Sequence, residues 1–398
     1  MFRRALAAGL ALALMVCAGP ASALPRPRGD QWWFATMGVQ GAWERSTGRG
    51  VTVAVIDRTF NRGLPEFAGA DVREGRDFRR KGDPAAKSWE EKNHGTGMLG
   101  LIAAGGGGSG YLGVAPDAAV LTVPMSVSSN MGELIRYAVD QGADVVSMSF
   151  SRLNPVIDEL HCDADLEDAI IYAAEHDVVL VASAGNNESG ENLTFEPAMC
   201  PGVVAVGGLS RRSAPKEGAL HHDYIAVAAP SGSMPVLSAS GGLSRVDGGT
   251  SSAAALTAGA IALIRAAHPG ESARQAVARL LYTARDVHTP GRDDYTGYGL
   301  IRPDLALAAE VPAGFSNAVY ERFDTFAKEQ ANWKDAVENP PDFTVGGDPD
   351  RKRRTTNDWQ TYGPWLLGAG VLALAAVLAV AVLFRRSRAR AKRQGGAV

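Results

Sequence analysis

The chain has 398 residues, and hydrophobic residues make up 46% of them, so it is long and apolar enough to bury a sizeable core. Its 40 basic and 43 acidic residues leave a formal net charge of -3, which argues against a protein that binds nucleic acid. The 46 glycines are typical of an α/β fold with many tight turns.

Residues 1–23 have the pattern of a secretory signal peptide. A basic start is followed by an apolar stretch at residues 5–16, and Ala21-Ser22-Ala23 fits the small-x-small cleavage pattern. Cys17 raises the alternative of a lipoprotein, although the valine before it fits that pattern poorly. The other alternative, an uncleaved anchor, is disfavoured because the apolar stretch is short. We therefore expect the rest of the chain to be exported.

Residues 24–57 are expected to form the start of the folded domain. Trp32, Trp33, Phe34 and Trp43 are too many aromatic residues for a free tail, and we expect them to pack onto the domain. Residues 51–56 then form an apolar, β-branched run, the pattern of a buried parallel strand, which ends at Asp57. An acid at the carboxyl end of a central strand lies where α/β sheets bind ligands. The alternative, usual for a lone Asp, is that Asp57 is a solvated turn residue.

The next segment changes from a charged to an apolar composition. Residues 61–92 are rich in charge and turn formers, and we expect a surface excursion. His94-Gly95-Thr96-Gly97 then leads into the apolar residues 98–104, so His94 is expected in the first turn of an apolar helix.

Strand-like and helix-like segments alternate further along the chain. We expect strands at residues 119–123, 144–150, 178–184 and 203–207, and helices at residues 132–141 and 166–176. Such alternation predicts an α/β fold whose mostly parallel sheet is covered by helices on both faces.

Residues 248–259 are the most informative stretch. A glycine pair leads into Ser251 and Ser252, and the residues up to position 264 are apolar apart from Thr257. A helix that is apolar all round belongs inside a protein, and this one is shorter than the ~20 residues that a membrane span needs. A serine at such a helix start can attack a carbonyl while N–H groups hold the oxyanion. The alternative is that Ser251 only caps a core helix.

The cysteines of the exported part indicate a disulfide. Of the three cysteines in the sequence, Cys162 and Cys200 remain after the signal is removed, and an even pair in an exported chain favours one bridge. Two free buried thiols are the alternative. Neither cysteine has the spacing of a metal site, and we expect no metal or other cofactor.

The last ninety residues indicate a membrane anchor. Residues 311–362 are charged and proline-containing, which predicts a linker with one short helix around residues 319–337. Residues 365–384 carry no charge and have the length of a membrane span, and six basic residues follow within residues 385–393. That cluster predicts a cytoplasmic tail, although four basic residues at 351–354 lie on the other flank.

With these blocks in view, residues 40–310 resemble a subtilisin-like serine protease. Asp57, His94 and Ser251 follow each other in the subtilisin order. They lie in blocks similar to those of the family, which are Val-Ala-Val-Ile-Asp, His-Gly-Thr and Gly-Thr-Ser-x-Ala. Two further blocks also match, at residues 183–186 and 113–116. The resemblance implies a three-layer subtilisin-like fold.

The same resemblance implies a role for each matching residue. Ser251 would be the nucleophile, His94 its general base and acid, and Asp57 the group that orients the imidazole. The side chain of Asn186 would donate to the oxyanion together with the backbone N–H of Ser251. Ser252 is a near rival as nucleophile, and the family register favours Ser251.

Several positions depart from the family pattern. Arg58 follows the Asp where the family has a small polar residue, and Gly97 and Ala255 replace a usual His and Pro. The departure with most bearing on substrates is in the strand expected to line the substrate pocket, Ser149-Phe150-Ser151-Arg152, which has no glycines at its end. If Arg152 points into the cleft, basic substrate side chains meet like charge. If it points outward, it is one more solvated arginine.

The order of the segments narrows the resemblance to the mycosins, membrane-anchored subtilases associated with type VII secretion. The expected organisation is a signal peptide at residues 1–23, a peptidase domain with an N-terminal extension at 24–310, a linker at 311–362, a transmembrane helix at 363–384 and a basic cytoplasmic tail at 385–398.

Two functions are compatible with this organisation. The first is a serine endopeptidase on the outer face of the cell membrane, single-pass, acting on protein or peptide substrates that a type VII system exports. The alternative is a structural component of that secretion complex with little proteolysis. The complete triad favours the first. Analogy with the family raises calcium as an alternative, but no ligand cluster in the sequence is convincing, so we expect none.

Overall fold

The computed structural model describes residues 26–80, 89–154, 161–186, 190–216, 218–246 and 249–338. The expected signal peptide, membrane helix and basic tail lie outside these residues, as does Gly248. The chain divides into two units, Met1–Trp333 and Lys334–Val398, and the described part of the second is the end of one helix.

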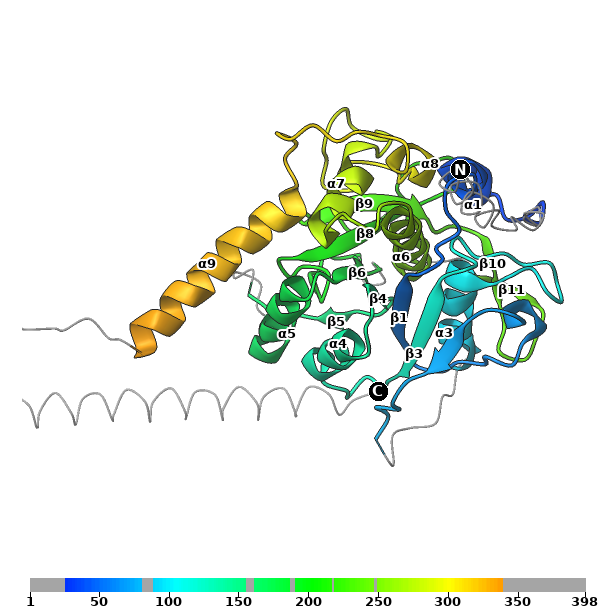
Figure 1. Cartoon of the computed structure of the whole chain (residues 1–398), viewed down its shortest axis with the longest axis horizontal. Coiled ribbons are helices and arrows are strands. Elements are labelled where there is room, and N and C mark those ends of the chain that lie inside the picture. Colours follow the sequence, from blue (N-terminus) through cyan, green and yellow to red (C-terminus); the bar gives the residue numbers. More distant parts are fainter. Residues whose placement is uncertain are drawn as a thin grey trace, which may run out of the picture. The chain divides into compact units, whose positions relative to one another are not determined.

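One seven-stranded sheet forms the centre of the first unit (Figure 1), with strand order β2-β3-β1-β4-β6-β8-β9 and every neighbouring pair parallel. Two small antiparallel pairs, β5 with β7 and β10 with β11, lie outside it. The strands are β1 Thr52–Asp57, β2 Val72–Glu74, β3 Ala119–Pro124, β4 Val145–Met148, β5 Arg152–Leu153, β6 Val179–Ser183, β7 Phe195–Glu196, β8 Val203–Leu209, β9 Ile225–Pro230, β10 Met234–Leu237 and β11 Leu243–Val246.

Helices cover both faces of this sheet, which makes three layers (Figure 1). Helices α4 and α5 pack together on one face, and α6 lies beside α3 on the other, where it contacts β4, β6, β8 and β9. The helices are α1 Trp33–Met37, α2 Val39–Trp43, η1 Pro65–Phe67, α3 Trp89–Ala103, α4 Met131–Asp140, α5 Ala164–Glu175, α6 Thr250–Ala267, α7 Ala273–Tyr282, α8 Pro303–Ala306 and α9 Ala318–Glu338.

The register of the central strands brings their carboxyl ends to one edge. Asp57 at the end of β1 pairs with Pro124 of β3, and Ile56 pairs with Met148 of β4. Met148 in turn pairs with Ala182 of β6. The residues that follow these strands therefore meet at a single carboxyl edge, the place where α/β sheets bind ligands.

The α/β fold with a parallel sheet is confirmed, and the expected central strands and helices are present with ends shifted by up to two residues. One expectation was wrong. Helix α3 begins at Trp89, so His94 lies in its second turn and not in the first. The charged residues before His94 looked like part of a surface excursion, but Glu and Lys are good helix formers and extend the helix.

The aromatic start of the chain packs into the domain as expected. Trp33 and Phe34 are 0% and 1% exposed, and the indole N–H of Trp43 donates to the carbonyl of Val114 at 2.8 Å. Gln31 is also buried, and its side-chain amide bonds both backbone groups of Leu112.

Helix α6 is the buried helix that its composition predicts. Among the described residues it is the one helix long and apolar enough to cross a membrane, yet 78% of it is buried inside the molecule. Helix α6 is therefore surrounded by α3 and by the strands of the sheet, so it is a core helix and not a membrane span.

The segment expected to be a linker contains α9, whose bounds agree with the helix expected around residues 319–337 to within one residue at each end. Val319, Tyr320 and Phe323 on one side of α9 are at most 7% exposed. Phe323 lies so close to Gly202 that a Cβ there would come within 2.7 Å of its ring. The start of α9 is thus part of the folded domain.

Cys162 and Cys200 form the expected disulfide, with their Cα atoms 5.9 Å apart. The bridge joins the segment just before the N-cap of α5 to the turn before β8.

Candidate active site

Asp57 and His94 meet at the carboxyl edge of the sheet. The Asp57 side chain is 3% exposed, and its two oxygens lie 3.0 and 2.8 Å from Nδ1 of His94, whose side chain is 18% exposed. The backbone N–H of Arg58 donates to the same carboxylate at 2.7 Å. A buried carboxylate that accepts the Nδ1 proton orients the ring and leaves Nε2 to accept a proton.

The two residues after His94 explain why this helix can lie so close to Asp57. A Cβ on Gly95 would come within 2.4 Å of the Thr59 carbonyl and 3.1 Å of the Asp57 Cβ. The buried hydroxyl of Thr96 accepts the backbone N–H of Asn61 at 2.9 Å. Glycine thus permits the close approach, and threonine holds the loop that follows Asp57.

Ser251 lies in the first turn of α6 and is tied to the end of β4. Its Oγ donates to the carbonyl of Ser149 at 3.1 Å, and the Oγ of Ser149 donates back to the carbonyl of Ser251 at 2.9 Å. Ser251 is partly exposed, whereas the rival Ser252 is 1% exposed. A nucleophile must be reached by substrate, so this difference favours Ser251 over Ser252.

Thr250 and Gly249 fix the amide of Asn186 next to this serine. The Asn186 Oδ1 accepts the backbone N–H of Thr250 at 3.0 Å, and the Thr250 hydroxyl donates to the carbonyl of Gly185 at 3.0 Å. A Cβ on Gly249 would come within 2.5 Å of Asn186 Nδ2. Fixing the amide oxygen also fixes the direction in which the NH2 group can donate.

A pocket of about 120 Å³ lies beside these residues. We call it the wall pocket, and we call Phe150, Ser151 and Arg152, which form one side of it, the substrate wall. Helix α4 and the loop before it form the other side. The lining residues are Arg58, Met125, Ser126, Val127, Ser129, Met131, Leu134, Phe150, Ser151 and Arg152. Ser149 differs from the other three expected wall residues, because its hydroxyl is buried against Ser251.

The side chain of Arg152 is 46% exposed and its charge is matched within the protein, so it is neither an unpaired charge in the cleft nor a solvated arginine without a partner. Its Nη2 lies 2.7 Å from Oε2 of Glu196, whose side chain is 6% exposed, and 3.7 Å from Oδ2 of Asp163. Arg152 therefore lines the pocket while its guanidinium is paired. Repulsion of basic substrate side chains by an unpaired Arg152 loses its physical basis.

Three residues that position the site were not singled out in the sequence. Thr250 fixes Asn186, and Glu196 neutralises Arg152. Asn93 is 5% exposed, and its Oδ1 accepts the hydroxyl of Ser238 and the N–H of Ala239, which ties the His94 helix to the β10–β11 turn. The available signals were that Thr250 belongs to the Gly-Thr-Ser block and that Asn93 directly precedes His94. Glu196 had none, because its partner lies 44 positions away.

The described residues hold no group of three or more His, Cys, Asp and Glu side chains that could bind a metal ion. The chemistry that the site offers is that of a hydroxyl, an imidazole with a buried carboxylate behind it, and an amide donor.

Comparisons with known proteins agree with this arrangement. The model of the subtilase family matches residues 48–299, a range that contains Asp57, His94 and Ser251. Fervidolysin of Fervidobacterium pennivorans is 30% identical over 71% of this chain, which spans 44% of the length of fervidolysin.

Mycosin-1 of Mycobacterium tuberculosis is 28% identical over 90% of this chain and 88% of its own length. The solved structure of the MycP3 protease from the type VII (ESX-3) secretion system superposes with a TM-score of 0.60 at 27% identity. It covers 73% of this chain and 90% of that one.

Proposed function

The chain belongs to the subtilase family, and from this premise we propose that it is a serine endopeptidase whose triad is Asp57, His94 and Ser251. The observation that carries the proposal is the contact of both Asp57 oxygens with His94 Nδ1, at 3.0 and 2.8 Å in a buried setting. A serine hydroxyl is too weakly acidic to attack an amide unaided, and this pair supplies the base.

In the proposed reaction the hydroxyl of Ser251 leaves the Ser149 carbonyl and donates its proton to His94 Nε2 as Oγ attacks the substrate carbonyl. The negative oxygen of the tetrahedral intermediate is bound by the Asn186 side chain and by the backbone N–H of Ser251. His94 then protonates the leaving amine, and a water molecule hydrolyses the acyl-enzyme by the same route. Asp57 stabilises the imidazolium throughout.

We further propose that the wall pocket takes an uncharged side chain of the substrate. Met125, Met131, Leu134 and Phe150 give it an apolar lining, and the charge of Arg152 is matched by Glu196. Phe150 and Ser151 occupy space that glycines leave open in the family, so we expect a narrow enzyme that is slow on generic protein substrates.

The proposed location is the outer face of the cell membrane, with one anchoring helix, and the proposed substrates are proteins that a type VII system exports. Similarity to mycosin-1 over 90% of this chain and to the MycP3 protease supports this assignment. The signal-like residues 1–23 and the uncharged residues 365–384 followed by basic residues are its sequence basis.

Replacement of each serine tests the peptidase proposal. Ser251→Ala should abolish hydrolysis of peptide substrates, with a loss of up to about 10⁶-fold in kcat, while Ser252→Ala should retain activity. Both variants should unfold with the wild-type midpoint to within a few degrees. If only Ser252→Ala loses activity, the nucleophile is Ser252 and our assignment is wrong. A folded wild-type protein without activity would favour the structural role.

A further inference from the structure

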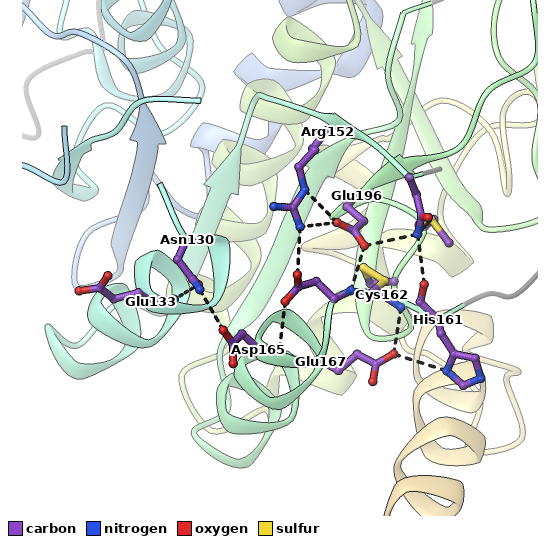
Figure 2. A network of polar contacts seen from close by, with 12 residues as sticks. Asn130, Glu133, Arg152, His161, Cys162, Asp165, Glu167 and Glu196 are labelled. Carbon is purple, nitrogen blue, oxygen red and sulfur yellow. Dashed lines mark hydrogen bonds and ion pairs between the residues drawn. A yellow bond between two sulfur atoms is a disulfide. The ribbon is translucent and has the colours of Figure 1, made fainter. Parts of the chain in front are cut away.

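The most heavily bonded carboxylate beside the substrate wall is that of Glu196. Its Oε2 accepts Nε and Nη2 of Arg152 at 3.2 and 2.7 Å, and its Oε1 accepts the backbone N–H of Asp163 at 2.9 Å and Nδ2 of Asn154 at 3.4 Å. Figure 2 shows Arg152 and Glu196 pointing toward each other within this network. A buried carboxylate with one cation and several donors is stable only while those partners stay in place.

The backbone reinforces this side-chain contact. Arg152 of β5 lies directly opposite Glu196 of β7 in an antiparallel pair, so the two side chains share one face. Arg152 also lines the wall pocket. The position of Glu196 therefore determines where the substrate wall lies.

The same network reaches the opposite side of the pocket. The Oδ1 of Asp163 accepts the N–H of Asp165 at 3.1 Å, and Oδ2 of Asp165 accepts Nδ2 of Asn130 at 3.0 Å. Asn130 caps α4 by accepting the N–H of Glu133 at 2.9 Å, and Figure 2 shows the side chain of Asn130 pointing toward Asp165. Since Met131 and Leu134 of α4 line the pocket, both of its sides are held by one set of hydrogen bonds.

We propose that Glu196 is a positioning residue for substrate binding, which holds the substrate wall in place and cancels the charge of Arg152. The inference rests on the proposed peptidase function and deepens it. With the carboxylate present, Arg152 adds no net charge to the wall, so its guanidinium does not select acidic substrate side chains. Without it, the guanidinium would keep only the half-exposed carboxylate of Asp163, 3.7 Å away, and would attract acidic substrate side chains.

The variant Glu196→Gln tests this in the purified full-length protein. The substrates are acetyl-tetrapeptide 4-nitroanilides with Ala, Glu or Lys at each position, and p-nitrophenyl acetate, which is too short to reach the wall. At the position that meets the wall, kcat/KM for Glu relative to Lys should rise about tenfold, mainly through KM. The kcat/KM for p-nitrophenyl acetate should fall by no more than about twofold.

Two further variants separate charge from structure. The double variant Glu196→Gln with Arg152→Gln has no unmatched charge and should return the Glu-to-Lys ratio to within about twofold of wild type. Asp324→Asn on α9, which removes the exposed ion pair with Arg274 of α7, is the matched control and should leave the ratio unchanged.

The inference is overturned if Glu196→Gln lowers peptide and ester hydrolysis by the same factor, or leaves the Glu-to-Lys ratio as it was. If Glu196→Gln does not fold, the double variant still tests positioning. Its peptide KM should then rise about threefold or more with little effect on the ester, and an equal loss on both overturns the inference. A folded wild-type protein that hydrolyses neither substrate overturns the peptidase proposal itself.

Discussion

Single glycines decide how closely the parts of the site can approach. Gly95 lets α3 pass the backbone at Thr59, and Gly249 lies directly under the amide of Asn186. Gly249 has φ -92° and ψ -171°, which is extended backbone that alanine also adopts. Glycine is therefore required at position 249 because a side chain there would collide with the amide of Asn186.

Gly249→Ala should act through Asn186. The new Cβ would come within 2.6 Å of both amide atoms and displace the proposed oxyanion donor, so kcat should fall about 10²–10³-fold. Gly270→Ala is the matched control, because a Cβ there meets nothing within 4 Å. In an Asn186→Ala background, Gly249→Ala should have little further effect on kcat. An equal loss in that background would show that Gly249 acts elsewhere.

At the scale of helices and strands, the sequence predicted most of what its local composition determines. The buried run that ends at Asp57 and the apolar helix after Ser251 are both present. The contacts of Arg152 with Glu196 could not be predicted, because the two residues lie 44 positions apart and meet through the pairing of β5 with β7. The same holds for Thr250 and Asn186, which lie 64 positions apart.

One ion pair between α7 and the turn before it should give the protein a measurable pH dependence. Arg279 of α7 bonds both oxygens of Glu271, and also the carbonyls of Ala306 at the end of α8 and of Ala309. Its hydrogen bonds hold the pKa of Glu271 below the usual 4.5. Because the pKa is lower in the folded state, the stabilisation is present above 4.5 and is lost as pH falls through the folded pKa.

Glu271→Gln should therefore lower the free energy of unfolding by about 1.5–3 kcal/mol at pH 7, the range for hydrogen bonds to charged groups. The difference from wild type should shrink toward zero as the pH is lowered below the ordinary pKa of 4.5. Urea unfolding at neutral and at acidic pH measures this difference in the free energy of unfolding. Asp324→Asn, which removes an exposed ion pair, is the control and should have a small effect at either pH. If the difference in unfolding free energy stays constant with pH, the ion pair is not its cause.

For the whole molecule, the proposed topology follows from the two ends of the chain. An exported amino-terminal domain and a basic tail after residue 384 agree with a single span whose tail is cytoplasmic. Protease added to intact spheroplasts that contain the full-length protein should digest the domain and leave the tail protected. A domain that resists digestion until the membrane is broken would contradict this topology.

The most direct test of the central claim is to find which atom of the folded protein a serine-specific reagent modifies. A fluorophosphonate should label the wild-type protein on Ser251, as identified by mass spectrometry of its peptides, because in the proposed triad His94, oriented by Asp57, activates that hydroxyl. His94→Ala should lose the label while the protein stays folded. An adduct on Ser252 or on another serine, or a folded wild-type protein that takes up no label, would contradict the proposed triad.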